Sequence, residues 1–267
     1  SVHGWGQYGL ATWIGISGDL FAERDKWPHA NMVTNEWLEA NIRRGVLGKM
    51  YPPHQFIMEG DTPSFLGLIP NGLNEPEYPE WGGWGGRYVP VYEGAGHRAD
   101  SQDRYVDGDG KSWNSNQASI FRWRGSFQND FAARMSWSLS PTFKDANHSP
   151  DLVLNGASGK APVRLSAKVG STVRLTAAGS KDPDGDRLTY RWWQYTEPSQ
   201  APGVRVPPLE MSGGDGLELS FKVPMYKMSN TNVPVPAAVA YHIILEVTDS
   251  GAPALTSYRR AVVTIQP

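Results

Sequence analysis

Residues 240–267 read AYHIILEVTDSGAPALTSYRRAVVTIQP, and this stretch decides how the C-terminal part of the chain folds. Two segments of strand length, rich in β-branched and aromatic residues, flank a short segment rich in Gly, Ala and Pro. Such a pattern predicts two strands, at residues 240–250 and 257–267, with a turn between them. No helical periodicity competes with this interpretation.

Four further segments upstream have the same character and are separated by turn residues at short spacing. They are PVRLSAKVG (162–170), TVRLTAAGS (172–180), LTYRWWQYTE (188–197) and LELSFKVP (217–224). Six or seven strands within roughly 115 residues predict an antiparallel β-sandwich of the immunoglobulin type. The segment ANHSPDLVLNG at 146–156 is typical of a linker, so we place this domain at 147–267.

The preceding part, residues 1–146, has a mixed pattern and contains nine of the eleven Trp residues. We expect helices at 35–44, after a capping Thr34, at a segment opened by Thr62, and at 129–137. The stretch from 70 to 119 shows no regular pattern, and a loop of that length is usually functional or disordered. Its aromatic residues favour a packed, functional loop.

Few helices and few strands make a poor α/β domain on their own. We therefore expect residues 1–146 to be the C-terminal part of a larger α/β domain whose sheet begins upstream. On this interpretation the chain is a fragment, or one of two chains from a cleaved precursor, and the upstream chain is a candidate partner.

Composition excludes several classes of protein. The chain has no Cys, which excludes disulfides, thiolate metal sites and a cysteine nucleophile. It has no apolar run long enough to span a membrane. A net charge of −2 argues against a nucleic-acid binder that works by bulk charge. We expect neither a nucleic acid nor a membrane as partner.

Five separated motifs, in order along the chain, resemble a bacterial cellulose-binding protein family. They are EGDTPSFLGLIPNGL, PEWGGWGGRY, SIFRWRGSFQNDFAARMSW, SKDPDGDRLTYRWWQY and HIILEVTDSGAPALTSYRR. The resemblance implies a nucleoside-hydrolase-like domain followed by an immunoglobulin-like domain. It also implies a protein exported to the periplasm or the extracellular space that acts on or near plant-type polysaccharide.

Nucleoside hydrolases bind calcium and activate water with an N-terminal cluster of the form D-x-D-x-x-x-D-D, and this chain contains no such string. The acidic string from Asp103 to Asp109 has a different spacing. The resemblance instead implies that Asp61, with Glu59 nearby, contributes to a calcium and sugar-diol shell, as candidate catalytic residues. A carboxylate between a strand end and a helix suits a ligand site in an α/β sheet. The alternative is that Asp61 simply caps the helix that follows.

The segment PEWGGWGGRY at 79–88 is a candidate binding loop. Its glycines allow the backbone to approach a ligand closely. Trp81, Trp84 and Tyr88 are candidates to stack on sugar rings, and Arg87 to bind hydroxyl or carboxylate oxygens. The alternative is a Gly-rich loop pinned by buried Trp residues, with Arg87 paired to a structural acid.

The turn DPDGD at 182–186 carries a second candidate calcium site, made of Asp182, Asp184 and Asp186 together with Asp249. Its alternative is a solvated Asx-type turn. The adjacent Trp192 and Trp193 should point to opposite faces of a strand. We therefore expect one in the core, and we take Trp193 as a candidate sugar platform.

A polar run near residues 116–130 gives a weaker signal. We expect Arg122 and Arg124 on one face of a strand, Asp130 at the start of a helix, and an Arg–Asp network that is structural. His3, beside two aromatic residues at the start of the chain, is a still weaker candidate.

Three functions remain open at this point. The first is a glycosidase that acts through calcium-held water. The second is a non-catalytic protein that binds polysaccharide through aromatic platforms, and the third is a purely structural role for the sandwich. A polysaccharide or glycoside is the expected ligand of the first two.

Overall fold

The computed structural model describes residues 9–18, 26–55, 61–92, 94, 96–199, 206–224 and 239–266. The chain divides into two compact units. Unit 1 comprises Ser1–Ile69 and Asn74–Asn147, and unit 2 comprises Pro70–Leu73 and His148–Pro267. The division at Asn147 lies one residue beyond the predicted boundary. The four residues at Pro70–Leu73 that join unit 2 were not predicted.

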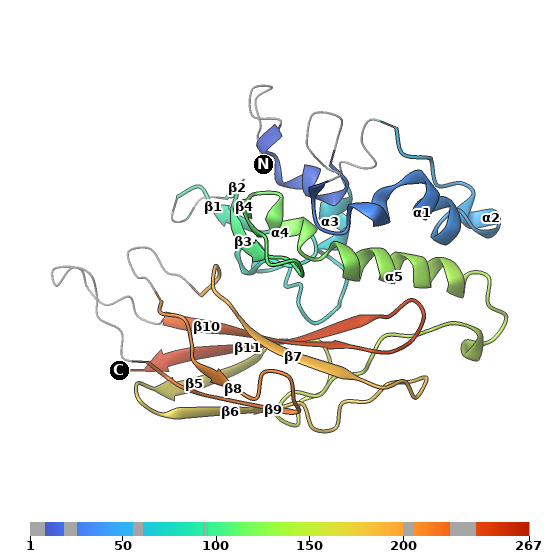
Figure 1. Ribbon diagram of the computed structural model, residues 1–267. Coiled ribbons are helices and arrows are strands. Elements are labelled where there is room, and N and C mark those ends of the chain that lie inside the picture. Colours follow the sequence, from blue (N-terminus) through green and yellow to red (C-terminus); the bar gives the residue numbers. More distant parts are fainter. Residues whose placement is uncertain are drawn as a thin grey trace. The chain divides into compact units, whose positions relative to one another are not determined.

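Unit 2 consists of two facing sheets (Figure 1). One has the strand order β5-β11-β10-β7 and the other β6-β9-β8. The strands are β5 (Val163–Lys168), β6 (Thr172–Thr176), β7 (Thr189–Tyr195), β8 (Met211–Ser212), β9 (Glu218–Lys222), β10 (Val239–Thr248) and β11 (Thr256–Gln266). All six quoted segments are thus confirmed as strands. The two-residue β8 is too short to leave a pattern in the sequence.

The expectation of a wholly antiparallel sandwich was wrong in one place, because β5 pairs with β11 in parallel. Parallel neighbours need a long connection between them, and here all the other strands of the unit separate β5 from β11. Alternate residues of the two sheets share one core, with Ile243 and Leu245 of β10 packed in the same cluster as Leu219 and Phe221 of β9. Unit 2 is therefore a two-layer sandwich, and its immunoglobulin type stays a prediction.

Segment 70–73 is held against β11. Strand β5 pairs only with Ala261 and later residues, which leaves the preceding edge of β11 open to another partner. The amide of Tyr258 donates to the carbonyl of Asn71 at 3.0 Å, and Nη2 of Arg260 donates to the carbonyl of Leu73 at 2.9 Å. The chain thus passes between the two units three times along its sequence.

Arg260 also contacts His242, with 3.0 Å between Nη1 and Nδ1, so this histidine ring accepts a hydrogen bond and is neutral. Burial, Arg260 and Arg164 together hold the pKa of His242 well below 6.5. In the unfolded chain the ring takes up a proton below about pH 6.5, so acid favours unfolding.

We expect the free energy of unfolding to fall as the pH drops below 6.5, and to fall less steeply in His242→Gln. Urea titrations at several pH values measure this, and identical slopes would contradict it.

Unit 1 is built from short helices and two small hairpins. The helical segments are η2 (Thr12–Ile16), η4 (Ala30–Val33), α1 (Asn35–Asn41), α2 (Gly45–Gly48), α3 (Thr62–Leu66), η5 (Pro79–Trp81), α4 (Ala118–Phe121), α5 (Arg124–Trp137) and η6 (Phe143–Asp145). The strands β1 (Tyr88–Pro90) and β2 (Arg98–Asp100) form one antiparallel pair, and β3 (Asp103–Val106) and β4 (Ser112–Ser115) the other.

The three predicted helices are present with different ends. Helix α1 ends at Asn41, three residues early, and Thr34 caps it by accepting a hydrogen bond from the Trp37 amide at 3.2 Å. Helix α5 begins at Arg124, five residues before the predicted start. The prediction that Arg122 and Arg124 lie on a strand was therefore wrong, since both are in or beside helices. Asp130 lies in the middle of α5 and not at its start.

The region from 70 to 119 is more regular than predicted, because it contains both hairpins. Their strands of three or four residues are too short to show alternation. The described strands of unit 1 are antiparallel pairs, so the structure supports a mixed helix–strand unit, while its α/β origin stays a prediction. The strand end expected at 56–58 lies outside the described residues, as do His3 and Glu59.

Aromatic side chains and one arginine fill the interior of unit 1. Phe121 is fully buried, and the rings of Trp27 and Trp113 lie 5.4 and 5.5 Å from it. The guanidinium of Arg124 donates to the carbonyls of Gly15, Ile16 and Pro28 at 2.7–2.9 Å. Burial lowers the pKa of Arg124 to about 9. Of the described Trp residues of this unit, Trp81, Trp84 and Trp123 are buried and the others are half-buried.

Candidate functional site

A groove of about 210 Å³ lies between α3 and the Gly-rich loop. It is lined by Pro63, Ser64, Gly67, Leu68, Asn74, Glu75, Pro76, Tyr78, Pro79, Gly82, Gly83, Gly85, Gly86 and Tyr88. Four of these are glycines of the predicted binding loop, so the backbone of that loop forms one wall. A side chain at Gly85 would overlap the carbonyl of Pro63, which explains why the loop can pack so closely on α3.

Asn74 fixes the Gly-rich loop to the end of α3. Its Nδ2 donates to the carbonyls of Leu66 and Ile69 at 2.6 and 2.8 Å. Its Oδ1 accepts from the amide of Trp84 at 2.9 Å. One side chain therefore ties the Gly-rich loop to the end of α3, although it gave no signal in the sequence.

The tryptophans of the loop do not form the platform that the sequence suggested. Trp84 is fully buried and packs edge-on against Phe127, and Trp81 is buried as well. Tyr78 lies flat on Trp81, with 4.3 Å between ring centroids and 12° between planes. Tyr78 is 39% exposed and lines the groove, so the aromatic surface belongs to the residue just before the quoted motif.

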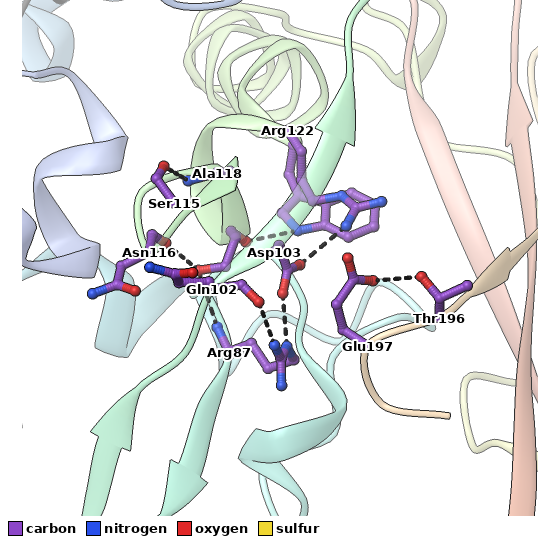
Figure 2. Close-up of polar contacts among 11 residues, drawn as sticks. Arg87, Gln102, Asp103, Ser115, Asn116, Ala118, Arg122, Thr196 and Glu197 are labelled. Atoms are coloured by element: carbon purple, nitrogen blue, oxygen red, sulfur yellow. Dashed lines mark hydrogen bonds and ion pairs between the residues drawn. The ribbon is translucent and has the colours of Figure 1, made fainter. Parts of the chain in front are cut away.

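Arg87 takes part in a buried ion network with Asp103 (Figure 2). Its Nε donates to Oδ1 of Asp103 at 2.7 Å, and its Nη2 donates to the carbonyl of Gln102 at 2.6 Å. Arg122 reaches the other oxygen of Asp103 at 3.0 Å. The alternative of a structural acid partner is therefore found in the structure, and the binding role of Arg87 stays a prediction.

Tyr88 is the predicted loop residue that both remains half-buried and lines the groove. Burial, and secondly the nearby Asp100 carboxylate, raise the pKa of its phenol above the usual value. The hydroxyl therefore keeps its proton at neutral pH and can donate a hydrogen bond to an oxygen in the groove.

A second hollow, of about 260 Å³, lies between α3 and α5. Its lining is mainly apolar, with a polar group at one side where Arg134 donates to Asp130 at 2.6 Å. The lining residues are Ile16, Thr62, Phe65, Leu66, Ile69, Phe127, Gln128, Asp130, Phe131 and Arg134. Sequence reasoning missed this hollow because its two sides are about sixty residues apart along the chain.

Asp61 occupies the N-cap position of α3, next to Thr62 of this second hollow, and its side chain is exposed. It makes no side-chain cap hydrogen bond, so the capping alternative is not found in the structure. Its catalytic and calcium-binding roles stay predictions. Glu59, its proposed neighbour, is outside the described residues.

The acidic turn of unit 2 has the geometry of an Asx turn. Oδ1 of Asp182 accepts from the amides of Asp184 and Asp186 at 2.9 and 3.1 Å. Asp184 accepts a hydrogen bond from the amide of His148 and also contacts Nδ1 of its ring. Asp249 accepts hydrogen bonds from the amides of Gly251 and Leu255 in its own loop.

Within the described ranges no three His, Cys, Asp or Glu side chains converge so that they could hold a metal ion. The aspartates of the turn do not fit a calcium site in this arrangement.

Trp192 and Trp193 point to opposite faces of β7, as predicted. Trp192 is in the sandwich core. Trp193 is half-buried, its Nε1 donates to Glu246 at 3.2 Å, and Arg191 lies 5.9 Å from its ring. These contacts leave its predicted role as a sugar platform untested.

Two family models match the chain. The nucleoside hydrolase-like domain of cellulose-binding Sde182 matches residues 1–88, and the C-terminal domain of cellulose-binding protein Sde0182 matches residues 172–265. The chain belongs to this cellulose-binding protein family. The resemblance stated from the five motifs is therefore confirmed.

Among solved structures, a nucleoside hydrolase-related hypothetical protein from Saccharophagus degradans, described as associated with carbohydrate metabolism, is 34% identical with a TM-score of 0.68. The match covers 87% of this chain and 54% of that one, so the chain spans about half of its relative. A PKD domain from KIAA 1837 protein is 15% identical with a TM-score of 0.25, and covers 39% of this chain and 79% of its own. No curated protein matches the chain. No described helix has the length and apolar character needed to cross a membrane.

Proposed function

We propose that the chain binds polysaccharide of the cellulose type through the groove between α3 and the Gly-rich loop. The observation that supports this most is Tyr78, which is 39% exposed along the groove and rests flat on Trp81. A ring held in this way is a rigid platform for the apolar face of a sugar. A mostly apolar groove with a few fixed polar groups is a typical ligand site.

The polar groups of the groove suit a sugar that carries many hydroxyls. The protonated phenol of Tyr88 donates a hydrogen bond, and the carboxylate of Glu75 accepts one. The matching family models describe cellulose-binding proteins, which supports a cellulose-type glucan as the ligand. A protein that binds such an insoluble polymer acts in the periplasm or outside the cell, which is part of this proposal.

We favour binding over hydrolysis for this groove. Glycoside hydrolysis generally uses two carboxyl groups on either side of the scissile bond. Of the described residues that line the groove, Glu75 alone carries a carboxylate. The glycosidase activity first considered, with Asp61 and calcium, stays a separate prediction that release of sugar from glycosides would test.

Replacing Tyr78 with alanine is expected to weaken binding to cellulose about tenfold. The substitution removes the ring on which the sugar stacks, and with it the apolar surface that stacking would bury. Tyr78→Phe keeps the ring and should retain most of the binding. The measurement is retention on microcrystalline cellulose, as a function of protein concentration.

Tyr92 provides the matched control, because it is 64% exposed in the same unit and does not line the groove. Tyr92→Ala should bind like the unchanged protein. If folded Tyr78→Ala is retained as well as Tyr92→Ala, the groove is not the binding site.

A further inference from the structure

We infer that the glucan chain crosses α3 and occupies both hollows, so that the ligand is an extended oligosaccharide segment and not a single sugar or a nucleoside. This inference rests on the proposed function, and it identifies the size of the ligand and a second contact surface. It follows from how α3 and the turn after it are divided between the two hollows.

Residues of α3 and its following turn alternate between the hollows with helical spacing. Pro63, Ser64, Gly67 and Leu68 line the groove, whereas Thr62, Phe65, Leu66 and Ile69 line the second hollow. Side chains three and four positions apart share a face of a helix. The two hollows therefore lie on two different faces of one helical segment, which forms the ridge between them.

Two large apolar side chains stand exposed on this ridge. Phe65 is 63% exposed and belongs to the second hollow, and Leu68 is 65% exposed and belongs to the groove. A single exposed apolar residue needs no explanation. Here, however, each side of the ridge presents one, and the flat ring of Phe65 offers a second sugar-stacking surface beyond Tyr78.

The second hollow also has polar groups suited to hydroxyls. Oδ2 of Asp130 accepts from Nε of Arg134 at 2.6 Å, and its Oδ1 from Nη2 at 3.3 Å. The side chain of Arg134 is partly exposed, while Asp130 is buried. The pair thus holds the guanidinium in place, with donors available to sugar oxygens.

The dimensions of a helix set the length of the ligand. A helix with its side chains is about 10–12 Å across, and a sugar chain has to span this distance to pass from one hollow to the other. A chain that fills both hollows and crosses the ridge therefore needs on the order of four sugars or more. A disaccharide can fill one hollow at most.

Calorimetric titration with cellobiose and cellohexaose tests this inference. We expect the unchanged protein to bind cellohexaose at least about tenfold more tightly than cellobiose. Phe65→Ala should lose most of that difference while binding cellobiose as before, whereas Tyr78→Ala should weaken both. Phe143→Ala is the matched control, because Phe143 is 57% exposed in the same unit and lines neither hollow.

The outcomes separate this inference from the proposed function. If Tyr78→Ala weakens binding but Phe65→Ala binds cellohexaose like the unchanged protein, the groove binds glucan and the crossing of α3 is wrong. Equal affinity of the unchanged protein for both sugars leads to the same conclusion. If the unchanged protein binds neither sugar and is not retained on cellulose, the proposed function itself is wrong.

Discussion

Replacing Asp103 with alanine should destabilise unit 1 by about 3–5 kcal/mol, because it leaves two buried guanidinium groups without their shared acid. Asp103 is fully buried, and its two carboxylate oxygens accept from Arg87 at 2.7 Å and Arg122 at 3.0 Å. Both arginines are themselves largely buried, so water cannot replace the lost partner at little cost. Cellulose retention should fall too, since Arg87 directly follows the glycines of the groove.

Urea unfolding followed by Trp fluorescence measures this loss, since nine of the eleven Trp residues precede residue 146. The matched control is Asp109→Ala in the same region, at an exposed aspartate, which should change the free energy of unfolding by less than about 0.5 kcal/mol. Asp103→Asn keeps the shape and removes the charge, and should fall between the two. Equal stability of the two alanine variants would show that the network contributes nothing.

The strands of unit 2 could be predicted because their patterns are long and local. The ten and eleven residues of β10 and β11 show the composition of strands without reference to any distant part of the chain. The parallel pairing of β5 with β11 could not be predicted in this way, because nothing near either strand specifies its partner. The same limit applies to segment 70–73, whose Asn71 meets Tyr258 far along the chain.

The predicted binding loop at 79–88 lines the groove that we propose as the site, but its Trp81, Trp84 and Arg87 do not. The glycines of the 79–88 segment were predicted to let the backbone approach a ligand, which stays a prediction, whereas in the structure Gly85 lets the loop pack against α3. Large aromatics are buried more often than they are presented to a ligand, and Trp81 and Trp84 follow that rule. Tyr78 was missed because it lies one residue before the motif, although a Tyr side chain commonly keeps its polar tip in water.

The sequence predicted a structural network of Arg and Asp side chains, but not which arginine pairs with which acid. An Arg–Asp pair was expected among residues 116–130, yet the acid that Arg122 uses is Asp103 on β3. Among the described residues, Arg124 bonds to three carbonyls and to no acid. The partners of a buried arginine depend on which polar groups are buried beside it, and that is a property of the folded chain.

Replacing Gly72 with alanine should cost on the order of 3–5 kcal/mol of unfolding free energy, through strain and lost hydrogen bonds. Gly72 has a φ of +85°, where an L side chain is strained, and a Cβ there would overlap the backbone carbonyl of Tyr258. Because the Cβ is fixed by its own backbone and meets a backbone carbonyl, no side-chain rotation relieves the clash, and segment 70–73 must move away from β11. That movement breaks the bond from the Tyr258 amide and the one from Arg260 to Leu73.

Gly170→Ala separates the clash from the strain. Gly170 has a similar φ of +79° in the same unit, but a Cβ there would meet no atom within 4 Å. It should therefore cost only the backbone strain, about 1–2 kcal/mol. Hydrogen exchange gives the site-specific measurement, with the Tyr258 amide exchanging faster in Gly72→Ala and not in Gly170→Ala. If the two variants lose the same stability and protect that amide equally, segment 70–73 is not what holds the free edge of β11.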